Sequence, residues 1–413
     1  MRVLMVTAGS WGDVAPYTGL GTRLRAAGHE VVLATHGRYE GAVTALGLGF
    51  RPLPVDPRVE LASPTGQRLT RAVSTPVSMA RVVRLARAFI PPLTDGVAAA
   101  VRAGADVVLA STLTEPLCAT LAEGYRLPCV GVHLLPVTPN RAFPPLVAGG
   151  RSFGPYGNEL TGRAIWAWGD RAFAPGVRAL RRELGLPARR FSGPLGLDPD
   201  RPVHHGFSPL VLPRPADWPA GHQVGGYWWP ERPPGWQPEQ RLLDFLAAGP
   251  PPVFAGFGSL VAADAERLGA LLAAALRKAK VRGIVQAGWS GLSAEGDDLI
   301  GVGEVPHDWL FPRTAAVIHH AGAGTTAAGL RAGVPAVPVP VHLDQPFWAA
   351  RLHALGVAPR PVRYQRLTVD GLAAAVREAT TDPGMLARAR ALSAALARED
   401  GAAPLLKTLA ELG

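Results

Sequence analysis

The stretch that decides the fold is Val-Ile-His-His-Ala-Gly-Ala-Gly-Thr-Thr at residues 317–326, followed by His-Leu-Asp-Gln at 342–345. The apolar run 315–318 predicts a buried parallel strand. The glycine-rich turn after it leads into a helix that opens at Thr325 and closes near Gly333. Glycines let a phosphate approach the backbone, free N–H groups face it, and the helix dipole favours its charge. The sequence therefore predicts an anion-binding cradle here.

A second apolar run, residues 336–341, ends at the polar segment that contains Asp344 and Gln345. Pro346 then starts another helix, at a position where proline is well tolerated. Carboxylate and amide groups at the carboxyl end of a parallel strand can bind neighbouring sugar hydroxyls. The alternative is that Asp344 only caps the helix that follows. A phosphate cradle one strand away from a hydroxyl-binding pair favours a nucleotide-sugar site.

An apolar run followed by a glycine-containing loop occurs twice along the chain, once near the start of each half. Residues 2–7 form an apolar run that meets the loop 8–13, and residues 252–257 form another that meets Gly258-Ser259. In each half, helical patterns then alternate with short β-branched runs, namely residues 31–34, 107–110, 130–133, 284–287 and 317–318. Strand–helix alternation of this kind is typical of doubly wound parallel sheets. The predicted fold class is α/β, with two Rossmann-like domains.

The length of 413 residues suits two domains of about 200 residues each. A stretch with seven prolines and four tryptophans, residues 213–238, is poorly suited to a helix and marks the boundary. We therefore expect four parts: a first domain over 1–212, a linker over 213–238, a second domain over 239–390 and a C-terminal helical stretch over 391–413.

Composition excludes several classes of function. The net charge is +10, but only three of the 42 basic residues are lysine, and the arginines form no basic run, which argues against nucleic-acid binding. No apolar run is long enough for a transmembrane helix, and residues 1–7 read as a strand rather than a signal peptide. Cys118 and Cys129 are too few for a disulfide framework, so a cytoplasmic protein is expected.

Asp13 is the candidate general base. It follows the first strand, at the carboxyl edge of the predicted sheet, where ligands bind in open α/β folds. The alternative is that Asp13 caps the helix after it, and one residue can do both. The metal-like motif Asp198-Pro199-Asp200 is flanked by prolines and reads as a turn, so no metal site is expected.

The motif of residues 319–326, with Asp344-Gln345 downstream, resembles the donor signature of the UDP-glycosyltransferase superfamily, especially its bacterial antibiotic and sterol branches. The likeness runs nearly end to end, because residues 1–16 and 225–259 are also similar to that family. It implies the GT-B fold, in which two Rossmann-like domains face a central cleft. It also implies that the last helical stretch crosses back to the first domain.

The resemblance assigns the donor site residue by residue. His320, the second histidine of the pair, would bind the diphosphate, whereas His319 would face the sheet interior. Gly322, Gly324, Thr325 and Ser259 would lie beside the diphosphate. The remaining assignments are Asp344 and Gln345 for the donor sugar, and Trp289 and Val305 for the nucleobase.

The acceptor side is expected in the first domain. Two irregular insertions rich in large apolar side chains occur at residues 57–92 and 136–170. Their composition suits a hydrophobic acceptor such as a macrolide or sterol. The candidate acceptor-binding residues are Trp11, His133, Phe143 and Trp166. The resemblance gives Asp13 the role of base, although Trp11 departs from the smaller or charged residue that the family more often has there.

Together these features predict an inverting, metal-independent glycosyltransferase that moves a hexose from a nucleotide diphosphate sugar to a hydroxyl of a hydrophobic acceptor. UDP-glucose is the first choice of donor, and TDP-sugars stay open. No cofactor is expected, and the chain should be a monomer or weak dimer. A nucleotide-sugar epimerase and a non-catalytic, nucleotide-sugar-binding accessory protein are the alternatives.

Overall fold

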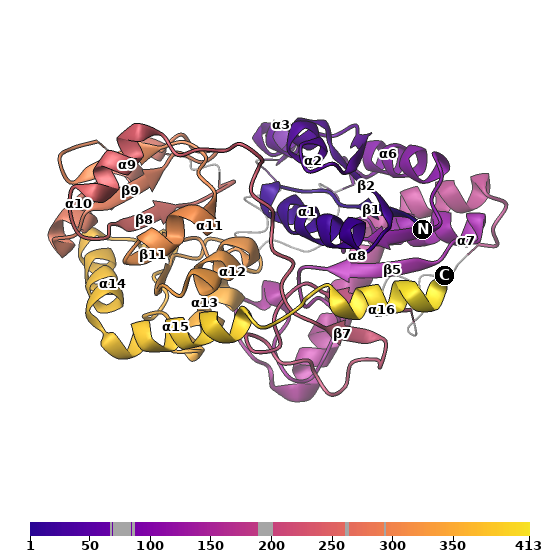
Figure 1. Ribbon diagram of the computed structural model, residues 1–413. Helices are drawn as coiled ribbons and strands as arrows, with labels where there is room; N and C mark the ends of the chain where they lie inside the picture. Colours follow the sequence, from indigo (N-terminus) through magenta and orange to yellow (C-terminus); the bar gives the residue numbers. More distant parts are fainter. Residues whose placement is uncertain (67, 69–83, 85–86, 189–200, 261–263, 293–294) are drawn as a thin grey trace. The chain divides into compact units, whose positions relative to one another are not determined.

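The computed structural model of the chain describes residues 1–66, 68, 84, 87–188, 201–260, 264–292 and 295–413. The chain divides into two compact units (Figure 1). The first consists of Met1–Pro234 and Glu399–Gly413, and the second of Gly235–Arg398. Asp198-Pro199-Asp200, part of the 57–92 insertion and residues 261–263 lie outside the described residues.

The described part of the first unit contains a sheet of seven parallel strands in the order β3-β2-β1-β4-β5-β6-β7. Its strands are β1 Arg2–Val6, β2 Glu30–His36, β3 Gly49–Leu53, β4 Val107–Ala110, β5 Cys129–His133, β6 Val203–His205 and β7 His222–Val224. Its helices are α1 Trp11–Ala26, α2 Glu40–Thr44, α3 Pro57–Ala62, α6 Ile90–Arg102, α7 Glu115–Tyr125, α8 Gly154–Glu183 and α16 Ala403–Leu412, with short 3-10 turns at η1 Gly37–Tyr39 and η2 Leu146–Ala148.

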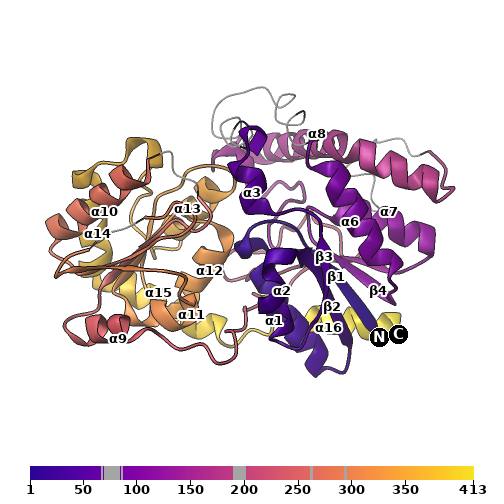
Figure 2. The ribbon, with the colours of Figure 1, turned by 90° about the horizontal axis from the view of Figure 1, so that it is seen from above.

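Alternation along the strands sends side chains to both faces of this sheet. Leu4 and Val6 of β1 pack with α6, α7 and α8, whereas Val3 and Met5 pack with α1, α2 and α16. Figure 2 shows the two helical layers on either side of these strands. Because both faces of the sheet are covered, β1, β2, β4 and β5 consist largely of apolar residues, and these four strands were predicted from the sequence.

The C-terminal segment packs on the first unit. Leu405 and Leu409 of α16, drawn in yellow in Figure 1, are fully buried in the same core as Val3 and Met5. The His204 Nε2 and Thr408 Oγ1 atoms are 2.9 Å apart, which links α16 to β6. The C-terminal stretch is not one continuous helix, because α15 ends at Leu396 and α16 begins at Ala403.

The boundary expected at residue 212 is wrong. β7 lies inside the stretch predicted to be a linker and pairs with β6, so the first unit continues to Pro234. The physical reason is that two of the four tryptophans of this stretch are core residues of the first unit: Trp218 and Trp228 are 4% and 3% exposed. Proline content correctly indicated the absence of a helix but concealed a three-residue strand.

The second unit contains a sheet of five parallel strands within the described residues, in the order β10-β9-β8-β11-β12. Its strands are β8 Val253–Gly256, β9 Gly283–Gln286, β10 Leu299–Val302, β11 Ala316–His319 and β12 Ala336–Pro338. Its helices are α9 Gln240–Ala247, α10 Ala265–Ala279, α11 His307–Leu310, α12 Ala323–Ala332, α13 Gln345–Ala354, α14 Val369–Thr381 and α15 Pro383–Leu396, with 3-10 turns at η4 Phe311–Arg313 and η5 Tyr364–Arg366.

Helices also cover both faces of this second sheet. α10 and α14 pack against one face, through residues such as Leu272 and Val376, and α9 and α11 pack against the other, through Leu242 and Leu310. The predicted class, two Rossmann-like α/β domains, is therefore confirmed. Among the described helices, none has both the length and the apolar content that crossing a bilayer requires.

Candidate functional site

The residues of the predicted cradle form the turn between β11 and α12. His319 ends β11 with no exposed surface, and its Nδ1 accepts a hydrogen bond from the Ala321 N–H at 3.1 Å. Ala321 has a φ of +62°, a left-handed conformation that a non-glycine residue adopts only when its surroundings enforce it. Gly322 is the N-cap of α12, and no side chain caps this helix. The N–H groups of its first turn, which includes Gly324 and Thr325, are therefore oriented to bind an anion.

His320 lies between two glycines. A Cβ atom placed on Gly322 would be 2.5 Å from the His320 Nε2, and one placed on Gly258 would be 3.3 Å from its Cε1. Burial, with smaller contributions from His342 and His307, lowers the pKa of His320 to about 4. The imidazole is therefore neutral near pH 7 and can donate one hydrogen bond. Its Nδ1 is buried without a partner among the described residues, which leaves Nε2 as the nitrogen available to a ligand.

Loops from neighbouring strands meet beside this turn. Gly258, after β8, has a φ of +55°, and its carbonyl accepts a hydrogen bond from the Trp289 N–H at 3.0 Å. Ser259, Trp289 and Val305 are all half-buried. They follow β8, β9 and β10, so they lie at the same carboxyl edge of the sheet as the cradle. The structure thus brings the predicted diphosphate and nucleobase residues to one edge.

Asp344 and Gln345 follow β12 at that edge, but they differ in what they can offer a ligand. The Gln345 Oε1 accepts hydrogen bonds from the Val341 N–H at 2.9 Å and the His342 N–H at 3.1 Å. Gln345 therefore stabilises its own turn, and because its Nε2 also lies 3.4 Å from the His342 Nδ1, one N–H of its amide remains for a ligand. Asp344 stands at the N-cap position of α13, and its side chain makes no capping hydrogen bond to this helix.

Asp13 occupies the third position of α1, and its side chain is hydrogen-bonded to Ser10, the residue that caps this helix. The Asp13 Oδ2 accepts from the Ser10 N–H at 2.8 Å and from the Ser10 Oγ at 2.9 Å. Asp13 is thus part of a capping arrangement and, since its side chain is exposed, also accessible to a ligand. Burial raises the pKa of Asp13 above its usual value, and the two hydrogen bonds from Ser10 oppose that rise without cancelling it.

Three of the four predicted acceptor residues have surface that a ligand can reach. Trp11 is 38% exposed and packs against Tyr39, with ring centroids 5.2 Å apart. Phe143 and Trp166 are half-buried, and the Phe143 ring lies 6.3 Å from that of Trp218. Trp11 and Asp13 belong to the same turn of α1, so the structure brings these two together.

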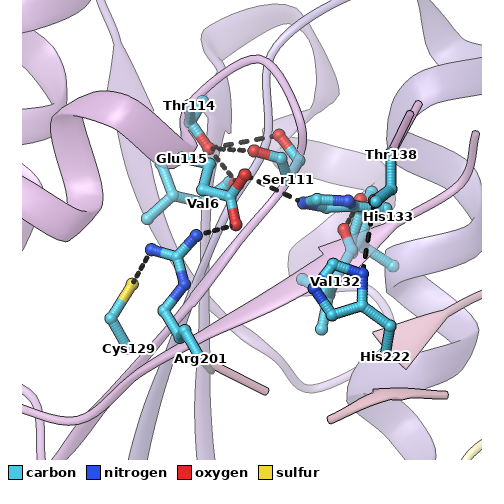
Figure 3. A network of polar contacts seen from close by, with 11 residues as sticks. Val6, Ser111, Thr114, Glu115, Cys129, Val132, His133, Thr138, Arg201 and His222 are labelled. Atoms are coloured by element: carbon cyan, nitrogen blue, oxygen red, sulfur yellow. Dashed lines mark hydrogen bonds and ion pairs between the residues drawn. The ribbon is translucent and has the colours of Figure 1, made fainter. Parts of the chain in front are cut away.

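His133 is the exception, and its assignment as an acceptor contact is corrected. It is 1% exposed at the end of β5, and its Nε2 is 3.2 Å from the Glu115 Oε2 (Figure 3). Glu115, also 1% exposed, forms an ion pair with Arg201. The buried Glu115 carboxylate needs both partners to offset its loss of water. The His133 side chain therefore belongs to the buried core and does not face an acceptor. Glu115 and Arg201 lie far from His133 in the sequence, so the sequence alone could not show that these residues interact.

His36 is a residue that sequence reasoning missed. It ends β2, is 2% exposed, and its Nε2 accepts a hydrogen bond from the Gly9 N–H at 2.8 Å. Gly9 has a φ of +137°, and a Cβ atom there would be 2.5 Å from the Asp13 Oδ2. The only signal in the sequence was a histidine at the carboxyl end of a β-branched run.

Within the described residues, no group of three or more His, Cys, Asp or Glu side chains is arranged to hold a metal ion. The hydrogen-bond donors that face the cradle are main-chain N–H groups and one neutral imidazole. Such an arrangement can bind a diphosphate and stabilise it as it leaves a sugar. A carboxylate such as Asp13 can accept a proton from a hydroxyl.

Two family models match this chain. Residues 3–144 match the glycosyltransferase family 28 N-terminal domain, and residues 284–412 match the erythromycin biosynthesis protein CIII-like C-terminal domain. An O-mycaminosyltylonolide 6-deoxyallosyltransferase from Streptomyces fradiae is 41% identical over 97% of this chain and 95% of its own length. The chain belongs to the UDP-glycosyltransferase superfamily, in its bacterial antibiotic branch. It is a glycosyltransferase, and this excludes the epimerase and the non-catalytic accessory protein.

Two further similarities extend this finding. A sterol 3-beta-glucosyltransferase from Arabidopsis thaliana is 32% identical over 98% of this glycosyltransferase, which spans 65% of that relative's length. A solved glycosyltransferase from Streptomyces sp. SF2575, complexed with thymidine diphosphate, has a TM-score of 0.64 at 24% identity, with 99% of each chain covered. The structural likeness supports the GT-B fold.

Proposed function

We propose that this glycosyltransferase moves a hexose from a nucleotide diphosphate sugar to a hydroxyl group of a hydrophobic natural product, with inversion at the anomeric carbon and without a metal ion. The observation that carries the proposal is the uncapped α12 N-terminus beside His320, in a chain whose Asp13 carboxylate is fixed at the edge of its other sheet. The first feature suits a departing diphosphate and the second a proton acceptor.

The donor would bind at the carboxyl edge of the second sheet. His320 and the N–H groups of Gly322, Gly324 and Thr325 would hold the diphosphate, with Ser259 beside them. Asp344 and the Gln345 NH₂ group would bind sugar hydroxyls. Trp289 and Val305 would contact the base.

UDP-glucose is the proposed donor, in keeping with the glucosyl transfer that names the sterol relative. A TDP-deoxysugar is the competing choice. The bacterial relative is named for transfer of a 6-deoxyallosyl group, and the similar solved structure holds thymidine diphosphate. The two donors differ in the base and in the sugar 6-hydroxyl, so a direct comparison separates them.

The reaction would be a single displacement. Asp13 accepts the proton of the acceptor hydroxyl while that oxygen forms a bond to the anomeric carbon. The bond from that carbon to the diphosphate oxygen breaks, and the nucleotide leaves with the electron pair. Attack opposite the leaving group converts an α-linked donor into a β-linked product (in D-sugar terms). The neutral His320 and the α12 N–H groups stabilise the charge that develops on the diphosphate, usually the largest electrostatic contribution.

The acceptor would be a macrolide, polyketide or sterol-like molecule that contacts Trp11, Phe143 and Trp166. Large aromatic side chains with surface left to bury suit such a ligand. We also propose a cytoplasmic monomer or weak dimer. Cys118 and Cys129 are both unpaired, and burial raises the pKa of each thiol, for Cys129 to about 11, as for packed, unreactive cysteines.

The test is product analysis with purified protein. UDP-glucose, TDP-glucose and a TDP-6-deoxyhexose are each incubated with a macrolide aglycone and a sterol, and products are identified by mass and by the anomeric coupling constant. We expect a β-glycoside, formed equally well in EDTA and in Mg²⁺. An α-linked product would refute inversion, and loss of activity in EDTA that Mg²⁺ restores would refute metal independence.

A further inference from the structure

We propose that His36 is a positioning residue for the Asp13 loop, because it accepts the hydrogen bond that orients Gly9 and, through Gly9, the Asp13 carboxylate. This inference rests on the proposed role of Asp13 as the base. His36 would touch neither substrate, since it is 2% exposed and its two ring nitrogens are both engaged within the first unit.

The two hydrogen bonds of the ring fix its protonation state. The His36 Nδ1 is 2.6 Å from the Val55 carbonyl oxygen, which can only accept, so Nδ1 carries the proton. The Gly9 N–H can only donate, so Nε2 is the unprotonated nitrogen that accepts at 2.8 Å. His36 is thus a neutral bridge between the loop after β1 and the segment after β3. Burial lowers the pKa of His36 and favours that neutral state.

Successive main-chain amides carry the orientation from His36 to Asp13. His36 accepts from the Gly9 N–H, and the next amide, that of Ser10, donates to the Asp13 Oδ2 at 2.8 Å. Gly9 has a φ of +137°, which favours glycine, and glycine is the residue with the least intrinsic restraint on its backbone. The acceptor on His36 therefore supplies the restraint that Gly9 lacks.

The hydrogen bonds that link His36, Gly9, Ser10 and Asp13 also determine which oxygen of the Asp13 carboxylate can react. Both Ser10 donors use the Asp13 Oδ2, at 2.8 and 2.9 Å, and no described residue donates to Oδ1. Oδ1 is then the oxygen that would accept the hydroxyl proton. Rotation of the Gly9 peptide would move Ser10 and turn that oxygen away from the productive position, and a misplacement of about 1 Å can reduce turnover about a hundredfold.

The ring contacts of His36 reinforce this placement. The His36 and Tyr39 centroids are 6.2 Å apart, and Tyr39 packs against Trp11, the first residue of α1, at 5.2 Å. The charged neighbours of His36, Arg38 and Asp56, pair with each other at 2.9 Å. His36 thereby joins the start of α1 to the ends of β2 and β3.

The experiment compares His36→Gln with His36→Met in the full chain. The two side chains have the same length, but only glutamine keeps an acceptor for the Gly9 N–H. We expect His36→Met to lower kcat about 10- to 100-fold, with donor KM and the Kd of the free nucleotide unchanged. His36→Gln should recover most of kcat. His29→Met is the matched control, because His29 directly precedes β2 at its other end and should leave kcat unchanged.

Each outcome decides the proposal. A kcat within twofold of wild type for His36→Met, or an equal loss in both His36 variants, would overturn it. If His36→Met does not fold, as judged by its circular dichroism and unfolding midpoint, a tenfold loss of kcat in folded His36→Gln would overturn it. Asp13→Asn is assayed in parallel. Normal turnover in that variant defeats the proposed function itself, whereas an inactive Asp13→Asn beside a normal His36→Met defeats only the role of His36.

Discussion

Gly322→Ala should weaken nucleotide binding by displacing His320. The new methyl carbon would be 2.5 Å from the His320 Nε2, whereas ordinary contacts begin near 3.4 Å, so the ring must move by roughly 1 Å. The backbone at Gly322 has φ −66° and ψ 150°, which alanine adopts without strain, so the effect is confined to the ring. A hydrogen bond to a charged group contributes about 1.5–3 kcal/mol, and a displacement of 1 Å breaks it. The Kd of UDP or TDP should therefore rise about 10- to 150-fold.

Isothermal titration calorimetry with UDP and TDP measures this change, and Gly329→Ala provides the control on the same helix. A Cβ atom on Gly329 meets nothing within 4 Å, so that variant should keep the wild-type Kd. It should even gain up to about 1 kcal/mol of stability, because alanine is the better helix former. An unchanged Kd in Gly322→Ala, with the protein folded, would refute the assignment of His320 to the diphosphate.

Two further predictions concern the first unit. Ser10→Ala removes one of the two donors that lower the pKa of Asp13, so its pKa should rise and the acid limb of the kcat/KM profile should move to higher pH; an unmoved limb would show that Asp13 does not control it. Glu115→Ala leaves Arg201 without its buried partner and should destabilise the first unit by about 3–5 kcal/mol in urea unfolding. Glu183→Ala, which removes an exposed ion pair, should change stability by less than about 1 kcal/mol, and equal effects of the two variants would contradict this reasoning.

The sequence was sufficient wherever a local pattern determines the structure. Buried parallel strands are continuous apolar runs, so the run 107–110 was predicted with the bounds that β4 has. The glycine turn 321–324 was found for a similar reason, because the approach of a phosphate requires glycine and an open helix start. The burial of His319 followed from its place at the end of such a strand.

The remaining features depend on partners that are distant in the sequence. From the sequence, His133 was predicted to contact the acceptor, and only the folded chain shows that it contacts the buried Glu115 instead. β7 is recognisable only from its pairing with β6, since its residues carry no strand signal of their own. Gln345 shows a third limit, because the same side chain can bind sugar hydroxyls or close its own turn, and only the hydrogen bonds to the main chain at 341–342 reveal the second role.

The central claim is that Asp13 removes the proton of the acceptor hydroxyl, and Asp13→Asn tests it most directly. Asparagine keeps the size and the hydrogen-bond acceptor that Ser10 needs, but it cannot take up the proton. Single-turnover rates and nucleotide Kd values are measured for both proteins with the same donor and acceptor. We predict a rate about 10²- to 10⁴-fold lower with an unchanged Kd. A single-turnover rate equal to that of the wild type would contradict the account.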